Sequence, residues 1–266
     1  MDAIRLLLVV IAAVIGGAMN AIAGGGTLVT FPALVWLGIP AIVANATSTV
    51  ALWPGAIGSM YGYRGELAGA RAWATRFAIP SLVGGLVGAL LLLRTPGERF
   101  DQIVPWLVLG ATVLFLVQRP LMTLLRKQRP GSASPASQSP IAEDDPASRA
   151  PTLPLLAFQF AVAVYGGYFG AGIGILMLAA LGFMGFTNIH RMNGLKNWGG
   201  LCMNATAAAL FVFSHLVNWP TAIAMAVGAT IGGFGGSRLA QRVPKEVVRA
   251  AVVVIGLSAS VWLFAK

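Results

Sequence analysis

The segment Gly24-Gly25-Gly26-Thr27 interrupts an apolar stretch that covers residues 6–37. Three consecutive glycines disfavour a continuous helix, because glycine loses more backbone freedom on ordering than any other residue. Broken backbone inside hydrocarbon is tolerated only where protein or a water-filled cavity surrounds it. Its opened amide and carbonyl groups can then bind an ion, as in transporters with discontinuous helices. The interruption therefore predicts an integral membrane transporter.

Polar residues gather around this break and at three further places. Asn20 and Thr27 flank the triple glycine, and the segment 44–49 (Ala-Asn-Ala-Thr-Ser-Thr) follows it. The matching places later in the chain are the glycine-rich segment 170–174 and the segment 193–198, which contains Lys196. Amides at a half-helix N-terminus and Ser or Thr hydroxyls donate to negative oxygens, and an ammonium group adds a point charge. These groups would suit a small oxyanion, and the candidate binding residues are Asn20, Gly25, Gly26, Thr27, Asn45, Thr47, Ser48, Gly172, Gly174, Asn193, Lys196 and Asn197.

Simpler roles remain open for several of these features. Gly84/Gly88 and Gly232/Gly236 have the spacing of helix-packing contacts. Ser and Thr hydroxyls in helices often bond to their own backbone. Lys196 could be a cytoplasmic loop residue that only sets topology.

Composition places the chain in the membrane. Of its 266 residues 57% are hydrophobic and 10% are charged, with a mean hydropathy of +0.80, whereas soluble domains have about 25% charged residues. Uncharged windows of spanning length lie between Leu6 and Arg64, at 77–93 and at 102–118. The net charge of +10 does not indicate nucleic acid, because the basic residues lie between apolar segments.

The acidic residues restrict the mechanism. All eight lie in expected termini, loops or linker, whereas proton relays usually need an Asp, Glu or His inside the membrane. We also find no nucleotide-binding glycine motif, no catalytic triad and no Cys/His metal cluster. The chain is therefore expected to be no enzyme, to need no cofactor or metal, and to lack a carboxylate-based coupling site.

Two halves of the chain match at an offset of 148 residues. A Pro/Ser-rich segment at 126–152, expected to be a disordered linker, separates a first repeat (1–125) from a second (153–266). The matched pairs are Gly26/Gly174, Leu28/Leu176, Asn45/Asn193, Gly84/Gly232, Gly85/Gly233, Gly88/Gly236, Arg94/Arg242 and Pro96/Pro244. Each half is expected to contain a broken helix pair (6–22 with 28–37; 155–169 with 175–184). Three transmembrane helices follow it (42–60, 73–93 and 102–118; 195–213, 219–237 and 248–264).

The distribution of basic residues favours inverted repeats. If each broken pair returns to its starting face, 14 of the 18 Lys and Arg residues are cytoplasmic; if each pair crosses once, the split is ten and eight. Because basic loops favour the cytoplasm, we expect an all-α polytopic membrane protein of two inverted-topology repeats with eight to ten membrane segments. Its linker is cytoplasmic and both termini are periplasmic.

The segments 17–34 (Gly-Ala-Met-Asn-Ala-Ile-Ala-Gly-Gly-Gly-Thr-Leu-Val-Thr-Phe-Pro-Ala-Leu) and 44–49 resemble the TauE/SafE family of sulfite exporters. The second-half segment 166–174, followed by Asn193, Lys196 and Asn197, is similar to that family too. The resemblance implies a bacterial inner-membrane carrier of sulfur-containing anions such as sulfite, sulfonates or thiosulfate. Its members differ in substrate, so the resemblance does not establish sulfite for this chain.

Physical reasoning favours export. Moving one negative charge out of a cell with an inside-negative potential gains about 2.3 kcal/mol per 100 mV, so export needs no coupled ion. The alternatives are a carrier for another ligand, such as an organic anion or a cation, or a membrane scaffold that does not transport. The expected partners are the sulfur anion and the lipid bilayer, with no nucleic acid, and a homodimer stays open.

Overall fold

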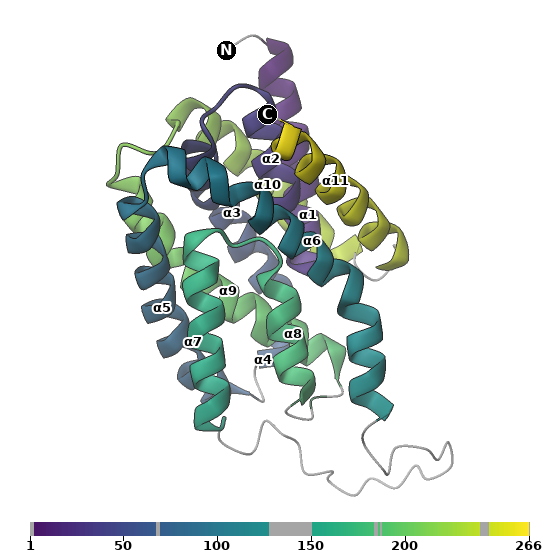
Figure 1. Ribbon diagram of the computed structural model, residues 1–266. Coiled ribbons are helices and arrows are strands. Elements are labelled where there is room, and N and C mark those ends of the chain that lie inside the picture. Colours follow the sequence, from purple (N-terminus) through teal and green to yellow (C-terminus); the bar gives the residue numbers. More distant parts are fainter. Residues whose placement is uncertain are drawn as a thin grey trace, which may run out of the picture.

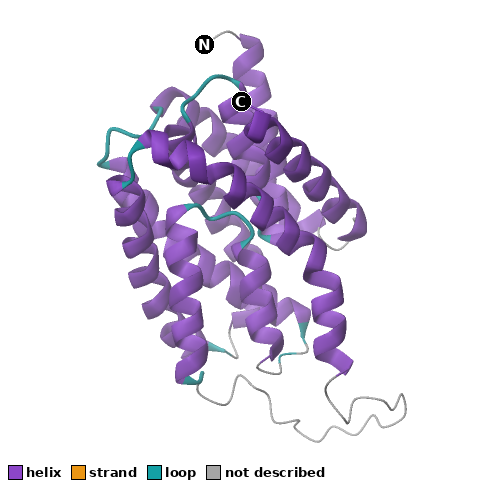
Figure 2. Ribbon diagram, in the orientation of Figure 1, coloured by secondary structure: helices purple, strands orange, loops and turns teal. Residues whose placement is uncertain are grey.

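Every regular element that the structure describes is a helix. The computed structural model describes residues 3–67, 70–127, 151–183, 186, 188–239 and 245–265, and Figure 2 shows helices joined by short loops. The predicted linker 126–152 lies outside these residues apart from its ends. The helices are α1 (Ala3–Ala23), α2 (Thr27–Trp36), α3 (Ala41–Gly62), α4 (Arg64–Leu67), α5 (Arg71–Arg94), α6 (Gly97–Lys127), α7 (Leu153–Tyr168), α8 (Ile173–Phe183), α9 (Ile189–Val212), α10 (Trp219–Leu239) and α11 (Lys245–Ala265).

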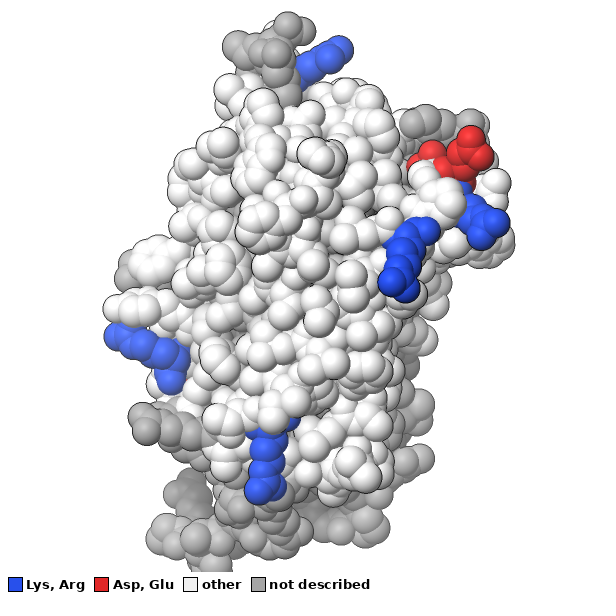
Figure 3. All heavy atoms as spheres, turned by 90° about the vertical axis from the view of Figure 1, so that its left-hand side faces the viewer, with Lys and Arg blue, Asp and Glu red and all other residues white. Residues whose placement is uncertain are grey.

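The outer surface of the helices is apolar. Ile79, Val254 and Val261 are each more than 60% exposed, which suits contact with lipid. Within the described part of the chain three helices are long and apolar enough to cross a membrane, over Ile4–Ile22, Ala72–Arg94 and Gly97–Val117. Figure 3 shows a face with few charged side chains and a broad area of other residues between them. The prediction of an all-α membrane protein is confirmed.

Both predicted helix breaks are present. Three residues separate α1 from α2, and four separate α7 from α8. Gly24 and Gly170 follow the ends of α1 and α7 with φ of 76° and 80°, a left-handed conformation that favours glycine. The Gly24 N–H donates to the carbonyls of Met19 and Asn20, and the Gly170 N–H donates to the Tyr165 carbonyl. Both helices therefore end in the left-handed turn that commonly stops a helix.

Helices at equivalent places in the two halves pack in equivalent ways. In the first half α1 packs on α10, and in the second half α7 packs on α5. Likewise α3 packs on α10, α9 packs on α5, and α6 packs on α11. Each half thus buries its broken helix pair against the other half. The labels N and C lie at one end of the molecule in Figure 1, and α7 begins at the opposite end. The inverted orientation in a membrane stays a prediction.

Glycines let the helices approach closely at these interfaces. A Cβ at Gly85 would meet the Met203 carbonyl, and one at Gly233 would meet the Gly55 carbonyl. Gly85 and Gly233 are 148 residues apart in sequence, and so are their partners Gly55 and Met203. Gly84, Gly88, Gly232 and Gly236 also lie against the backbone of α7 or α1. The helix-packing role of the Gly-xxx-Gly spacing is confirmed.

The offset of 148 holds where the three later helices of each half begin, at Ala41 and Ile189, Arg71 and Trp219, and Gly97 and Lys245. At the broken pairs it is kept only in part. The helices after the breaks begin at Thr27 and Ile173, which are 146 apart. The first break has one left-handed glycine, Gly24, whereas the second has two, Gly170 and Gly172, which lie 146 and 148 residues after Gly24. The two breaks therefore differ in their local backbone.

Candidate functional site

The two breaks lie against each other in the middle of the fold. A Cβ at Gly24 would lie 2.6 Å from the Cα of Gly174, and one at Gly170 would lie 3.9 Å from the Thr27 hydroxyl oxygen. Only glycine allows the first of these approaches, because a side chain would displace backbone atoms. The expectation that the loose helix ends face each other is confirmed.

Each break is held by a side chain from the opposite half. The last carbonyls of a helix have no partner within it and carry partial negative charge. The Asn45 amide nitrogen on α3 donates to the Tyr168 carbonyl at the end of α7, at 2.9 Å. The Lys196 ammonium on α9 donates to the Ala21 carbonyl near the end of α1, at 3.4 Å. We call these two contacts the Asn45 cap and the Lys196 cap.

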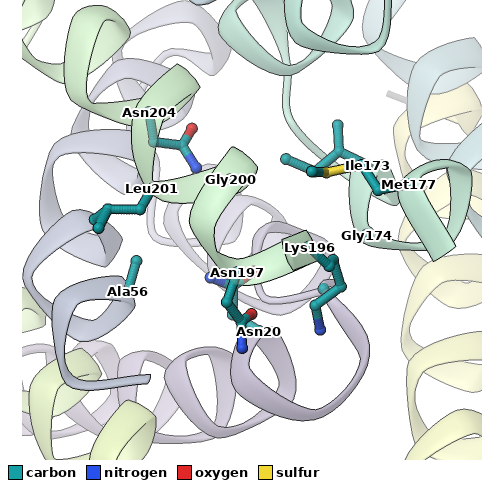
Figure 4. A pocket seen from close by; sticks show the side chains of 11 residues that line it. Asn20, Ala56, Ile173, Gly174, Met177, Lys196, Asn197, Gly200, Leu201 and Asn204 are labelled. Carbon is teal, nitrogen blue, oxygen red and sulfur yellow. The ribbon is translucent and has the colours of Figure 1, made fainter. Parts of the chain in front are cut away.

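A small cavity opens beside the Lys196 cap. Its volume is about 20 Å³, enough for roughly one water molecule. In Figure 4 the side chains of Asn20, Lys196 and Asn197 lie near one another at one end of the view, and Asn204 lies at the other end. The cavity is lined by residues from both breaks and from α3 and α9: Asn20, Gly24, Ala56, Ile173, Gly174, Met177, Lys196, Asn197, Gly200, Leu201 and Asn204.

The cavity presents positive charge and a free N–H group. Lys196 is 2% exposed, and Asn197 is 9% exposed with a buried amide nitrogen that has no partner. None of the described residues that line the cavity is acidic. A buried ammonium without a carboxylate and a buried donor without an acceptor are both costly. An anion would satisfy both groups.

Four of the predicted binding residues line this cavity together: Asn20, Gly174, Lys196 and Asn197. The predicted glycines Gly25, Gly26 and Gly172 pack elsewhere, against Phe115, the Gly16 carbonyl and Ala111 respectively. Thr27 is half-buried beside Gly170. No ligand tests these residues, so their contact with an anion stays a prediction.

The remaining predicted residues are buried and do not line the cavity. Asn45 forms its cap, and the Thr47 hydroxyl accepts from the Asn218 N–H at 3.0 Å. The Ser48 and Thr30 hydroxyls lie 2.6 Å apart. Asn193 is 8% exposed, and its amide oxygen has no partner. The structure therefore does not bring these side chains to the cavity in this conformation.

Sequence reasoning missed Asn204 and Gly200. A helix brings residues three, four and seven apart onto one face, so Asn197, Gly200 and Asn204 form one stripe of α9 along the cavity. This periodicity was readable in the sequence once Lys196 and Asn197 were chosen, but the expected polar segment ended at residue 198. The signal for Asn204 was its helical spacing.

The described residues contain no group of three or more His, Cys, Asp or Glu side chains that could hold a metal ion. The site as described thus offers one cation, amides and backbone groups. Such a set can bind and release an anion.

Comparison with known proteins agrees with this geometry. The family model described as "Sulfite exporter TauE/SafE" matches residues 9–263. A "Probable membrane transporter protein" of Haemophilus influenzae is 27% identical over 244 residues, which cover 89% of this chain and 86% of that protein. A "Probable membrane transporter protein ORF9" of Sinorhizobium is 27% identical over 264 residues, covering 96% and 90%. The "Probable membrane transporter protein YfcA" of Escherichia coli K12 is 29% identical over 252 residues, covering 91% and 83%. This chain belongs to the TauE/SafE sulfite exporter family and is a membrane transporter.

Proposed function

We propose that the protein exports sulfite, or a related sulfur-containing anion such as a sulfonate or thiosulfate, across the bacterial inner membrane. The anion binds between the two breaks, in the cavity beside Lys196. The observation that carries this proposal is the buried Lys196 ammonium, which shares the cavity with the unpartnered amide nitrogen of Asn197, while none of the described lining residues is acidic.

The ammonium group has donors to spare. A lysine carries three N–H donors, and one of them is directed at the Ala21 carbonyl. The other two can donate to oxyanion oxygens, and such charge-assisted bonds are about twice as strong as neutral ones. Asn197 adds a further donor. A trigonal or tetrahedral oxyanion offers several acceptors, and it would neutralise a charge that otherwise pays a desolvation cost.

The proposed topology gives the site access from both sides. The two broken pairs enter the membrane from opposite faces as inverted repeats, with the linker in the cytoplasm and both termini in the periplasm. Rocking of one repeat against the other would then expose the cavity to each face in turn. The membrane potential supplies about 2.3 kcal/mol per 100 mV for each negative charge that leaves the cell. None of the described residues that line the site is a carboxylate that could couple export to protons.

Flux measurements in liposomes test this proposal. Protein reconstituted into vesicles loaded with sulfite under anaerobic conditions should release sulfite when a potential with a negative interior is imposed with potassium and valinomycin. No proton or sodium gradient should be needed. Flux that requires either gradient would contradict uncoupled export, and vesicles that release a small carboxylate but neither sulfite, thiosulfate nor sulfonate would favour a carrier for another organic anion. No flux of any anion would favour a scaffold.

A further inference from the structure

The cavity beside Lys196 is polar at two separate places. Lys196, Asn197 and Asn20 form the first, and Asn204 forms the second. Asn197 and Asn204 are seven residues apart on α9, which corresponds to about 10 Å along a helix axis at 1.5 Å per residue. A single sulfite ion bound at Lys196 would not span that distance.

Gly200 leaves the space between these two places open. It lies between Asn197 and Asn204 on the same face of α9, and a Cβ built at Gly200 would meet no atom within 4 Å. Most glycines at the helix interfaces differ, because a Cβ there would meet backbone at under 3.0 Å. Gly200 therefore contributes room along the cavity rather than close helix packing.

The other side chains that line the cavity are apolar. They belong to Ala56, Leu201, Ile173 and Met177. A bound molecule that reached from Lys196 to Asn204 would pass these side chains with a short hydrocarbon segment. The cavity is narrow in this conformation, so the walls must move apart as the molecule enters, as alternating access requires.

We propose that Asn204 is a specificity-determining residue that binds the neutral polar end of a short organic anion whose charged end lies at Lys196. This inference rests on the proposed function and narrows it. The preferred substrate class is a sulfonate with an apolar spacer of two to four carbons and a terminal hydroxyl or carbonyl group. The side-chain amide of Asn204 can donate to such a group and accept from it.

The duplication supports a single orientation for that substrate. The residue 148 positions before Asn204 is Ala56, and Ala56 lines the same cavity from α3. One half of the protein thus provides an amide where the other half provides only a methyl group. Because Lys196 also belongs to α9, both ends of the substrate are recognised by one helix, and the ligand can bind in only one direction.

Binding measurements with a matched pair of probes test the inference. The probes are 3-hydroxypropane-1-sulfonate and propane-1-sulfonate, which differ by one hydroxyl group, and sulfite is titrated alongside them into purified protein. The wild type should bind the hydroxylated probe about 2- to 10-fold more tightly, the effect of one neutral hydrogen bond. Asn204→Ala and Asn204→Leu should bring the ratio of the two affinities close to one. The exposed substitution Arg94→Gln, at the end of α5, should leave the ratio at its wild-type value.

The outcomes separate the two proposals. A wild-type ratio of one, or a ratio that persists in both Asn204 variants while they remain folded, overturns the role of Asn204 and leaves sulfite binding intact. A wild type that binds neither sulfite nor the two sulfonates overturns the proposed function and the inference with it. A ratio that collapses in either folded Asn204 variant supports the inference.

Discussion

The two helix breaks share a backbone design but are held by different chemistry. Both contain a left-handed glycine just after the first helix ends, and in both a side chain from the opposite half donates to a carbonyl near that helix end. The Asn45 cap is neutral, whereas the Lys196 cap is charged, and the cavity lies beside the charged one. The two halves therefore have similar frameworks, and among the described residues only one of them has a positive charge at its break. The comparison suggests that one break supports the fold while the other also binds the anion.

Among the substitutions that test this comparison, removal of the charge at Lys196 should have the largest effect, and the effect is on sulfite affinity. Lys196→Ala should abolish measurable sulfite binding, with a loss of more than about 30-fold, because truncating one partner of a buried charge pair costs about 2–5 kcal/mol or more. The protein should stay folded in detergent. Calorimetric titration gives the affinity, with exposed Arg94→Ala as the control. Wild-type affinity in Lys196→Ala would remove Lys196 from the site.

Substitution of the glycine at the first break should destabilise the fold strongly. Gly24→Ala places a side chain at φ of 76°, which costs about 1–2 kcal/mol, and presses it against the backbone of Gly174. Overpacking adds about 1–3 kcal/mol. Gly38 is a matched control, since its φ is 90° and a Cβ there would meet nothing within 4 Å.

Unfolding of the two glycine variants can be compared in detergent with a denaturant. Gly38→Ala should lower the free energy of unfolding only by the cost of the left-handed conformation, about 1–2 kcal/mol. Gly24→Ala should lower it clearly more. Equal losses in the two variants would show that the contact between the breaks contributes nothing to stability.

Disruption of the neutral cap should lower stability to a smaller extent. Asn45→Leu leaves the buried Tyr168 carbonyl without the donor that it has at 2.9 Å, at a cost of about 1–3 kcal/mol. The free energy of unfolding in detergent measures this cost, with Ile42→Leu on the same helix as the control for a change of shape alone. A loss no greater than that of Ile42→Leu would indicate that the end of α7 is held in another way.

The smallest expected effect is at Ser48, which lies 148 residues before Lys196 and is its counterpart in the first half. Ser48→Ala removes the 2.6 Å contact with Thr30, and we expect a loss of about 0.5–1.5 kcal/mol in the free energy of unfolding. The sulfite affinity of Ser48→Ala should equal that of the wild type, because Ser48 does not line the cavity beside Lys196. A fall in affinity would place Ser48 at the ligand, which the present cavity lining does not include.

The sequence predicted the framework because its signals are local. Gly24 and Gly170 are preceded and followed by apolar runs, and the backbone freedom of glycine together with the need to satisfy polar groups in lipid predicts a break at each. Lys196 was also identifiable, because it lies in the segment 193–198 that matches the polar segment 44–49, and its ammonium group can bind an anion. The periodic repeat then predicted which helices are equivalent.

The contacts of individual side chains depend on packing that local patterns do not contain. One turn of α3 contains Asn45, Thr47 and Ser48, and local patterns do not show which of them meets the ligand. In the structure Asn45 has its partner on α7, Ser48 has its partner on α2, and Thr47 has its partner at Asn218, the residue before α10. Asn204 was missed because one asparagine in an apolar helix is a weak signal until the cavity beside it is known. The extra residue in the second break was missed because the glycine-rich segments align equally well at neighbouring offsets.

The position of a bound anion tests the central claim most directly. Selenite is a heavy analogue of sulfite, and its selenium can be located by anomalous scattering in crystals grown with the protein at saturating concentration. The account predicts one anomalous peak in the cavity, with selenite oxygens at about 2.7–2.9 Å from the Lys196 nitrogen. A selenite peak beside the Asn45 cap instead, or an empty Lys196 cavity in crystals that bind selenite elsewhere in the helical core, would contradict it.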